Sequence, residues 1–295
     1  EKGVLNTYLD EVLTQQQLGV YAQDQMRFGD GWVATLNGRY DLVRTEADAT
    51  IGTSYNSDDR AASGRAGLAY EFANGVTPYA SASTFFDPVI GTGATEPLVP
   101  EDGHQFEAGV KYQPTFVDGL FTVSAFQITK NNWTLTDPAT FLPSQIGQVK
   151  STGLEFEAKV NLNESWKVLA SATYQKLEIT RHLTADLVGN SPYLIPDVTA
   201  SMWLDYTLPE NLVDGVSVGA GLRYQGKSWA DEANTLRVPD ALLADAGIRY
   251  EKNGLNVSVN VTNLFDKQYV AGCQGALTCG YGQGRTVLLK IGKAW

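Results

Sequence analysis

Residues 255–262 read Leu-Asn-Val-Ser-Val-Asn-Val-Thr, and this alternation of apolar and polar side chains decides the fold. Successive side chains of a β-strand point to opposite faces of a sheet, so a period of two predicts a strand with one apolar face and one polar face. The same alternation recurs at 32–42, 154–161 and 216–225. Helical periodicity is nearly absent, and the chain is therefore predicted to be all-β.

About 13 strands of this kind are predicted along the chain. Many of them approach the ~9–11 residues that cross a bilayer when a strand is tilted. The other predicted strands lie near 17–28, 63–72, 76–86, 104–112, 120–133, 147–160, 166–179, 198–206, 242–251 and 285–295.

The connections between these strands alternate between short and long. Short turns are predicted at 29–31, 74–75, 114–119, 161–164, 209–215 and 252–254. Long polar loops are predicted at 44–62, 87–103, 134–146, 180–197, 227–241 and 264–284. Short periplasmic turns and long external loops are typical of outer-membrane barrels, so we expect an antiparallel transmembrane β-barrel meander with its apolar face outward. The C-terminus is then expected on the periplasmic side.

A soluble β-sandwich, as in a binding module, also alternates in this way and is the main alternative fold. Its inner faces would form an apolar core, whereas several predicted inner positions here are charged. A wide barrel can line a wet or plugged lumen with charge. These positions are Arg39, Asp41, Glu155, Glu157, Lys159, Arg223, Asp245 and Arg249.

Composition narrows the range of functions. The formal net charge of −11 argues against a nucleic-acid partner, because no basic stripe is present to neutralise phosphates. No stretch approaches the ~20 apolar residues that a membrane-spanning helix needs. No signal peptide is visible, and Glu1 is not an initiator methionine, so a mature or truncated chain is expected.

Few residues offer catalytic or metal-binding chemistry. His104 and His182 are the only histidines, and they lie apart from each other and from the cysteines, which makes a poor metal site. We therefore expect no catalytic residues and no cofactor. Cys273 and Cys279 stand close together in the last predicted loop, where a disulfide or a reduced pair is possible.

A motif near the C-terminus resembles the signature of TonB-dependent receptors. It reads Asn263-Leu264-Phe265-Asp266-Lys267-x-Tyr269 and is followed by Gly284-Arg285-Thr286 and a final strand that ends on an aromatic residue. Further segments resemble the ferrichrome-type (hydroxamate) siderophore receptors of this family. They are 19–25, 38–41, 74–79, 106–112, 153–159 and the Cys273-x5-Cys279 pair.

The resemblance implies a 22-stranded barrel closed by an N-terminal plug. Residues 1–295 would then be the C-terminal part of the barrel domain, and the plug, the segment that contacts TonB and about nine early strands would be absent. It implies an outer-membrane receptor for ferric siderophore uptake that is energised through TonB and is not an enzyme. The implied partners are a ferric siderophore, TonB, outer-membrane lipid and the outer-membrane assembly machinery. A passive porin is a further alternative, which the signature argues against.

Loop aromatics are the candidate residues for ligand capture, with anchoring at the membrane interface as their alternative role. They are Phe86, Trp133, Phe141, Tyr193, Trp229 and Tyr281. The resemblance adds Gln274, which follows the first cysteine of the last loop where ferrichrome receptors carry an aromatic ligand contact. It also implies that Trp295 is the assembly signal, and that Lys293 occupies a position normally apolar in the family.

Overall fold

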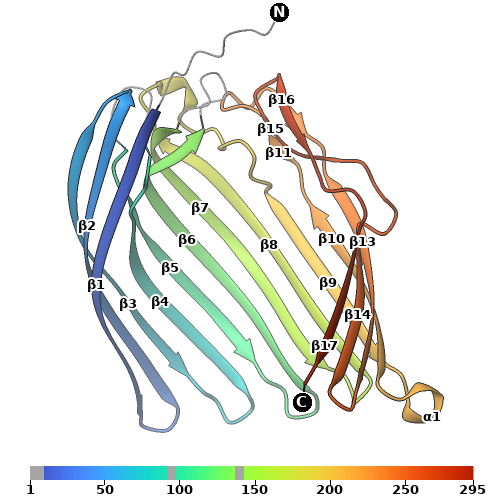
Figure 1. Cartoon of the computed structure of the whole chain (residues 1–295). Coiled ribbons are helices and arrows are strands. Elements are labelled where there is room, and N and C mark those ends of the chain that lie inside the picture. Colours follow the sequence, from blue (N-terminus) through green and yellow to red (C-terminus); the bar gives the residue numbers. More distant parts are fainter. Residues whose placement is uncertain (1–9, 92–97, 137–142, 295) are drawn as a thin grey trace, which may run out of the picture.

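The computed structural model describes residues 10–91, 98–136 and 143–294. Its main feature is one antiparallel sheet of 13 strands, each paired with its neighbours in chain order. The sheet curves like a section of barrel wall (Figure 1). Its strands are β1 (Asp10–Phe28), β2 (Trp32–Ile51), β3 (Tyr55–Tyr70), β4 (Val76–Asp87), β5 (Glu101–Tyr112), β6 (Asp118–Thr136), β7 (Pro143–Asn161), β8 (Trp166–Arg181), β9 (Val198–Thr207), β10 (Val216–Gln225), β13 (Ala241–Lys252), β14 (Leu255–Thr262) and β17 (Thr286–Lys293).

The predicted meander and its strand number are confirmed, and the β-sandwich alternative is wrong. In the described ranges, all 13 long strands belong to the same sheet, and no second sheet of comparable size packs against it. A sandwich would hide an apolar face between two layers, whereas here many large apolar side chains are exposed on the sheet surface. The fold therefore fits part of a larger membrane barrel.

The described parts of the connections at the external end contain four short strands and one 3-10 turn. These are β11 (Ser228–Trp229) with β12 (Arg237–Val238), β15 (Val270–Gln274) with β16 (Thr278–Tyr281), and η1 (Ala185–Leu187). The opposite end carries a single short helix, α1 (Glu210–Val213), which lies with the short turns (Figure 1). Within the described residues, no helix has the length and apolar character needed to cross a membrane.

The prediction of a long loop at 44–62 is wrong. Strand β2 continues to Ile51 and β3 begins at Tyr55, so only residues 52–54 connect them. The outward side chains turn polar beyond Leu42, which resembles a loop in sequence, but the strands stay hydrogen-bonded to each other as they leave the membrane. The loop predicted at 134–146 is shorter for the same reason, since β6 extends to Thr136 and β7 starts at Pro143.

The two faces of the sheet differ in polarity. Apolar residues pair in register across the strands on one face, as in the row that joins Val110, Val123, Phe156 and Ala172. Side chains of this face are exposed, Val123 and Phe156 being 52% and 39% accessible, as a surface in contact with lipid requires. The opposite face carries the charged residues, so the apolar face points outward and the polar face lines the interior.

Aromatic rings gather at the end of the short turns. Trp32 contacts both Phe28 and Tyr70, and Trp166 lies 4.4 Å from Tyr206 between ring centroids. Outer-membrane barrels carry girdles of aromatic residues at the membrane–water interfaces. These rings therefore place the periplasmic interface at the short-turn end, and the long connections at the external end.

Candidate functional site

The signature motif forms a turn that is fixed by the side chain of Asn263. Its amide donates to the backbone oxygens of Lys267 and Gln283 at 2.9 and 3.1 Å, and its carbonyl oxygen accepts the N–H of Lys267 at 2.8 Å. Asn263 is only 2% exposed and adopts a positive φ of 50°, which asparagine tolerates better than most residues. One buried side chain thus holds both ends of the last external loop.

The rest of the motif joins this turn to the neighbouring strands. The carboxylate of Asp245 on β13 accepts the backbone N–H of Asn263 and a two-pronged contact from Arg223 on β10, whose Nη2 lies 2.9 Å from Oδ1. Asp266 accepts the backbone N–H of Arg285 at 2.8 Å. The signature residues therefore stabilise the join between three strands and a loop, which is a structural role.

Tyr269 closes the signature by lying against Gly282. A β-carbon added to Gly282 would meet the Tyr269 ring at 1.9 Å, so only glycine leaves space for the ring. The backbone N–H of Gly282 also donates to the backbone oxygen of Tyr269 at 2.8 Å. In contrast, the Phe265 side chain is 78% exposed. Leu264 contributes to the turn through its backbone N–H, which donates to the backbone oxygen of Ala244.

Three external connections, 182–197, 226–240 and 263–285, pack into one cap above the strands β8 to β14. The side-chain amide of Asn234 exchanges hydrogen bonds with the backbone of Ser191, both at 2.8 Å. The backbone N–H of Leu194 donates to the backbone oxygen of Trp229 at 2.9 Å, and the backbone N–H of Gly275 donates to the backbone oxygen of Ala230 at 2.6 Å. The cap is therefore a folded unit that can present a fixed surface to the outside.

A disulfide lies within this cap. Cys273 and Cys279 are bonded to each other and face each other across the hairpin β15–β16. Cys273 is buried and packs with Ala230 and Val238 of the neighbouring connection. The bond thus fixes the hairpin whose other face carries Gln274, which pairs with Thr278.

Asp231 orders the connection between β11 and β12. Partial burial of its carboxyl raises its pKa, but hydrogen bonds from the Thr235 hydroxyl and from the backbone N–H groups of Leu236 and Thr235 outweigh this effect. The pKa is consequently held below its ordinary value. Next to this turn, the guanidinium of Arg237 lies 4.2 Å over the Trp229 ring, a cation–π contact.

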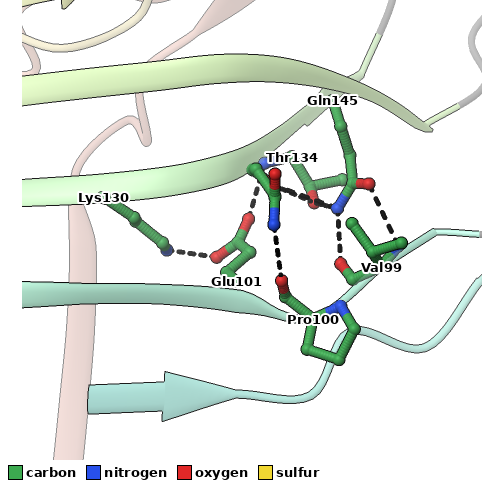
Figure 2. Close-up of polar contacts among 7 residues, drawn as sticks. Val99, Pro100, Glu101, Lys130, Thr134 and Gln145 are labelled. Carbon is green, nitrogen blue, oxygen red and sulfur yellow. Dashed lines mark hydrogen bonds and ion pairs between the residues drawn. The ribbon is translucent and has the colours of Figure 1, made fainter. Parts of the chain in front are cut away.

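A second cluster clamps the chain that enters β5 onto the hairpin of β6 and β7 (Figure 2). Glu101 is 5% exposed and binds the ammonium of Lys130 and the backbone N–H of Thr134. Gln145 exchanges hydrogen bonds with the backbone of Val99 at 2.7 and 3.1 Å. The connection from β4 to β5 is therefore held at its β5 end against the external end of the wall.

The interior face carries carboxylates from neighbouring strands. Glu107 accepts a hydrogen bond from the Tyr79 hydroxyl at 2.6 Å and another from Gln105 at 3.0 Å. Glu155 and Glu157 lie on the same face of β7. Glu107, Tyr79, Arg65 and Lys111 line an interior hollow of about 750 Å³. This face can receive polar and cationic groups.

Aromatic rings lie flat on glycines along the interior face. The Tyr79 ring covers Gly109, and the Phe126 ring covers Gly153, where an added β-carbon would come within 2.9 and 2.5 Å of the rings. Trp203 covers Gly219 and Gly221 in the same way. Side chains that lie flat keep the wall thin and leave the interior open for another segment.

The candidate capture residues differ in their exposure to solvent. Tyr281 is 80% exposed at the end of β16, and Trp229 and Gln274 lie in the cap at intermediate exposure. Tyr193 is 1% exposed, and Trp133 packs on a cluster that includes Ile146 and Ile179. Phe86 shares the outward face of β4. Phe141 and Trp295 lie outside the described residues.

Other residues of the site were not expected from the sequence. Tyr79 meets Glu107, Glu101 meets Lys130 and Gln145 meets Val99 through the pairing of successive strands, and no local motif marks these residues. Their only signal is a polar side chain at an inward position of an alternating strand. Within the described ranges, no group of three or more His, Cys, Asp or Glu residues is placed to hold a metal ion.

Comparisons with known proteins agree with this architecture. A family model described as "TonB dependent receptor-like, beta-barrel" matches residues 2–264. The Ferrioxamine receptor of Yersinia enterocolitica is 37% identical over 98% of this chain and 41% of its own length. The Ferrichrome outer membrane transporter/phage receptor of Escherichia coli is 38% identical over 93% of this chain and 37% of its own length. The chain thus spans about two fifths of the length of these relatives.

A solved structure shares the fold. The siderophore receptor PiuA from Acinetobacter baumannii superimposes with a TM-score of 0.79 at 23% identity, over 96% of this chain and 44% of that one. From the family match, the identity to these relatives and the open, outwardly apolar wall, we conclude that the chain belongs to the β-barrel family of TonB-dependent receptors, which are proteins of the bacterial outer membrane.

Proposed function

We propose that the whole protein imports a ferric siderophore of the hydroxamate class across the outer membrane, with energy supplied through TonB. Residues 1–295 would form the C-terminal part of its barrel domain. The observation that carries the proposal is the identity of 34–38% to receptors named for ferrioxamine and ferrichrome, over 93–99% of this chain. The polar interior face and the ordered external cap are consistent with it.

The interior face would receive the plug of the whole protein. Glu107, Glu155 and Glu157 leave carboxylate oxygens on this face, and rings lying over glycines keep the wall thin. Cationic side chains of a plug could pair with these carboxylates, and such contacts can break and re-form because the surface is wet. Release of the plug by TonB would then open a path along the wall.

The external cap would supply the first contacts with the siderophore. Tyr281, Gln274 and Trp229 are accessible there and remain our proposed contacts. Tyr193 and Trp133 are enclosed by neighbouring residues, so in this arrangement they support the cap and the wall. The iron arrives chelated as cargo, so the protein would need no metal ligands of its own, no cofactor and no covalent chemistry, and we propose that it is not an enzyme.

Binding and uptake by the full-length receptor test the proposal. We expect quenching of tryptophan fluorescence at low ligand concentration with ferrioxamine B or ferrichrome, and a weaker response with a ferric tris-catecholate. Uptake of radioactive iron should require TonB. Tyr281→Ala should weaken binding severalfold, with Leu277→Ala as the control, since Leu277 is 99% exposed in the same hairpin.

Two results would contradict the proposal. Equal binding of all three ferric complexes would remove the hydroxamate assignment. Uptake that continues at the same rate without TonB and does not saturate would favour the passive porin.

A further inference from the structure

The outward face of β4 to β8 holds a hollow that the transport function does not use. Its volume is about 660 Å³, within the usual range for small-molecule sites. Small residues form its floor, and larger apolar residues form its walls. The floor is Ala80, Ala108 and Ala125, and the walls are Phe106, Leu154 and Tyr174.

Strand register places these residues on the outward face. Ala108 pairs with both Ala80 and Ala125, and Ala125 pairs with Leu154, which pairs with Tyr174. The walls remain half exposed, at 53% for Phe106, 54% for Leu154 and 56% for Tyr174. The hollow therefore opens toward the hydrocarbon of the membrane and away from the interior.

A row of polar side chains borders the hollow on its external side. In register, Gln127 of β6 pairs with Thr152 of β7, and Thr152 pairs with Lys176 of β8. All three line the hollow, and the Lys176 side chain is 71% exposed. The next row on this face, toward the external end of the strands, contains Lys150, which pairs with Glu178 across the strands.

Lys176 lies at the external boundary of the apolar band. On β2, the outward face stays apolar from Trp32 to Leu42, which corresponds to about 25 Å of height for a tilted strand. On β8, the outward face stays apolar from Trp166 to Tyr174, and Lys176 follows at the same sequence distance from Trp166 as Leu42 from Trp32. Lys176 therefore lies where the hydrocarbon gives way to lipid headgroups, at the depth of a lipid phosphate.

We infer that this hollow binds one anionic lipid of the outer leaflet, with an acyl chain over the alanine floor and the phosphate against Lys176, Thr152 and Gln127. The ammonium, hydroxyl and amide can each donate a hydrogen bond to phosphate oxygens, and the negative charge of the phosphate attracts the Lys176 ammonium. Glu178 lies 3.2 Å from Lys176, so the lipid would compete with an exposed ion pair, which is a weak competitor. The inference rests on the outer-membrane location and is independent of which siderophore is carried.

Lipid retention by the full-length receptor in detergent tests this site. The probes are phosphatidylglycerol and phosphatidylcholine with the same acyl chains, titrated under native mass spectrometry. We expect one phosphatidylglycerol to bind in preference to phosphatidylcholine. Lys176→Ala should weaken that binding about tenfold, because it removes a charge-assisted hydrogen bond. Ala108→Leu should also weaken it, because it fills the floor.

Two matched variants serve as controls, both on outward positions away from the hollow. Lys293→Ala removes another outward cation, and Ala246→Leu fills another outward alanine position. Neither should change lipid binding. Equal binding of both lipids, or unchanged binding in Lys176→Ala and Ala108→Leu, would overturn the inference. A receptor dimer that is lost in Ala108→Leu would also overturn it, since the hollow would then be an interface between copies.

Discussion

The Oδ1 atom of Asp245 accepts a hydrogen bond from the backbone N–H of Asn263 at 2.8 Å, which ties β13 to the turn that follows β14. The same atom accepts from Nη2 of Arg223 at 2.9 Å, so β10 joins the contact. Asn263, which the signature motif identifies in the sequence, is thus held by two charged residues that belong to no motif. The role of Asn263 is to close the last external loop.

Replacement of Asn263 by alanine should destabilise the protein by about 2–4 kcal/mol, because it removes a buried side chain that makes three hydrogen bonds to the backbone of Lys267 and Gln283. Asn256→Ala is the control, since Asn256 makes a single exposed hydrogen bond to Glu251. Urea unfolding of the receptor in lipid vesicles measures the difference. Equal stability of the two variants would contradict the role assigned to the turn.

Gly282→Ala should disturb the last loop, because its β-carbon would meet the Tyr269 ring at 1.9 Å. We expect a loss of about 1–3 kcal/mol, as for other overpacked sites. Gly280→Ala should be nearly silent, since its nearest atom would be 4.0 Å away. Adding Tyr269→Ala to Gly282→Ala should recover part of the loss in a double-mutant cycle, and purely additive effects would rule out the proposed contact.

Mass spectrometry of unreduced receptor from outer membranes should find Cys273 and Cys279 joined, and two free thiols would refute the bond. Closing so short a loop stabilises by roughly 2 kcal/mol in the chain-entropy model. Replacing both cysteines with serine should therefore loosen the cap while the barrel strands stay folded. Hydrogen exchange should show faster exchange in 269–282 and unchanged exchange in β5 to β8.

The turn at Asp231 should loosen in acid. Its folded pKa is lowered, so its contribution is fully present above the unfolded value near 3.9 and is lost as pH falls through the folded pKa. Protection of the Thr235 and Leu236 amides, corrected for intrinsic exchange, should fall as the pH is lowered below about 3.9 and through the folded pKa. Asp231→Asn should remove this dependence, and an identical pH profile in that variant would assign the effect to another group.

Deletion of Trp295 from the full-length receptor should impair assembly much more than Lys293→Ala does. Lys293 faces outward at the periplasmic rim, where a cation costs about 0–1 kcal/mol. Its ammonium also donates a hydrogen bond to the backbone oxygen of Asn253 at 2.6 Å. The assay is the amount of folded receptor in outer-membrane fractions, judged by heat-modifiable gel mobility. An unchanged amount without Trp295 would show that this residue is no targeting signal.

The sequence by itself determined the strands, their order and the side of the sheet that faces lipid. A period of two is a local property, as in 255–262, and it requires only the geometry of an extended chain. The signature at Asn263 likewise identified the family. The extent of β2 and β3 was missed because polar residues outside the membrane no longer alternate with apolar ones, although their backbones still pair.

Only the tertiary structure decided which residues meet. Tyr193 and Tyr281 look alike in the sequence, yet one is buried under the neighbouring loops and the other is 80% exposed. Glu101 finds Lys130, and Lys176 joins the row with Gln127, because strand register aligns residues far apart in the chain. Register depends on the pairing of whole strands and on the turns between them, so no single stretch of sequence contains it.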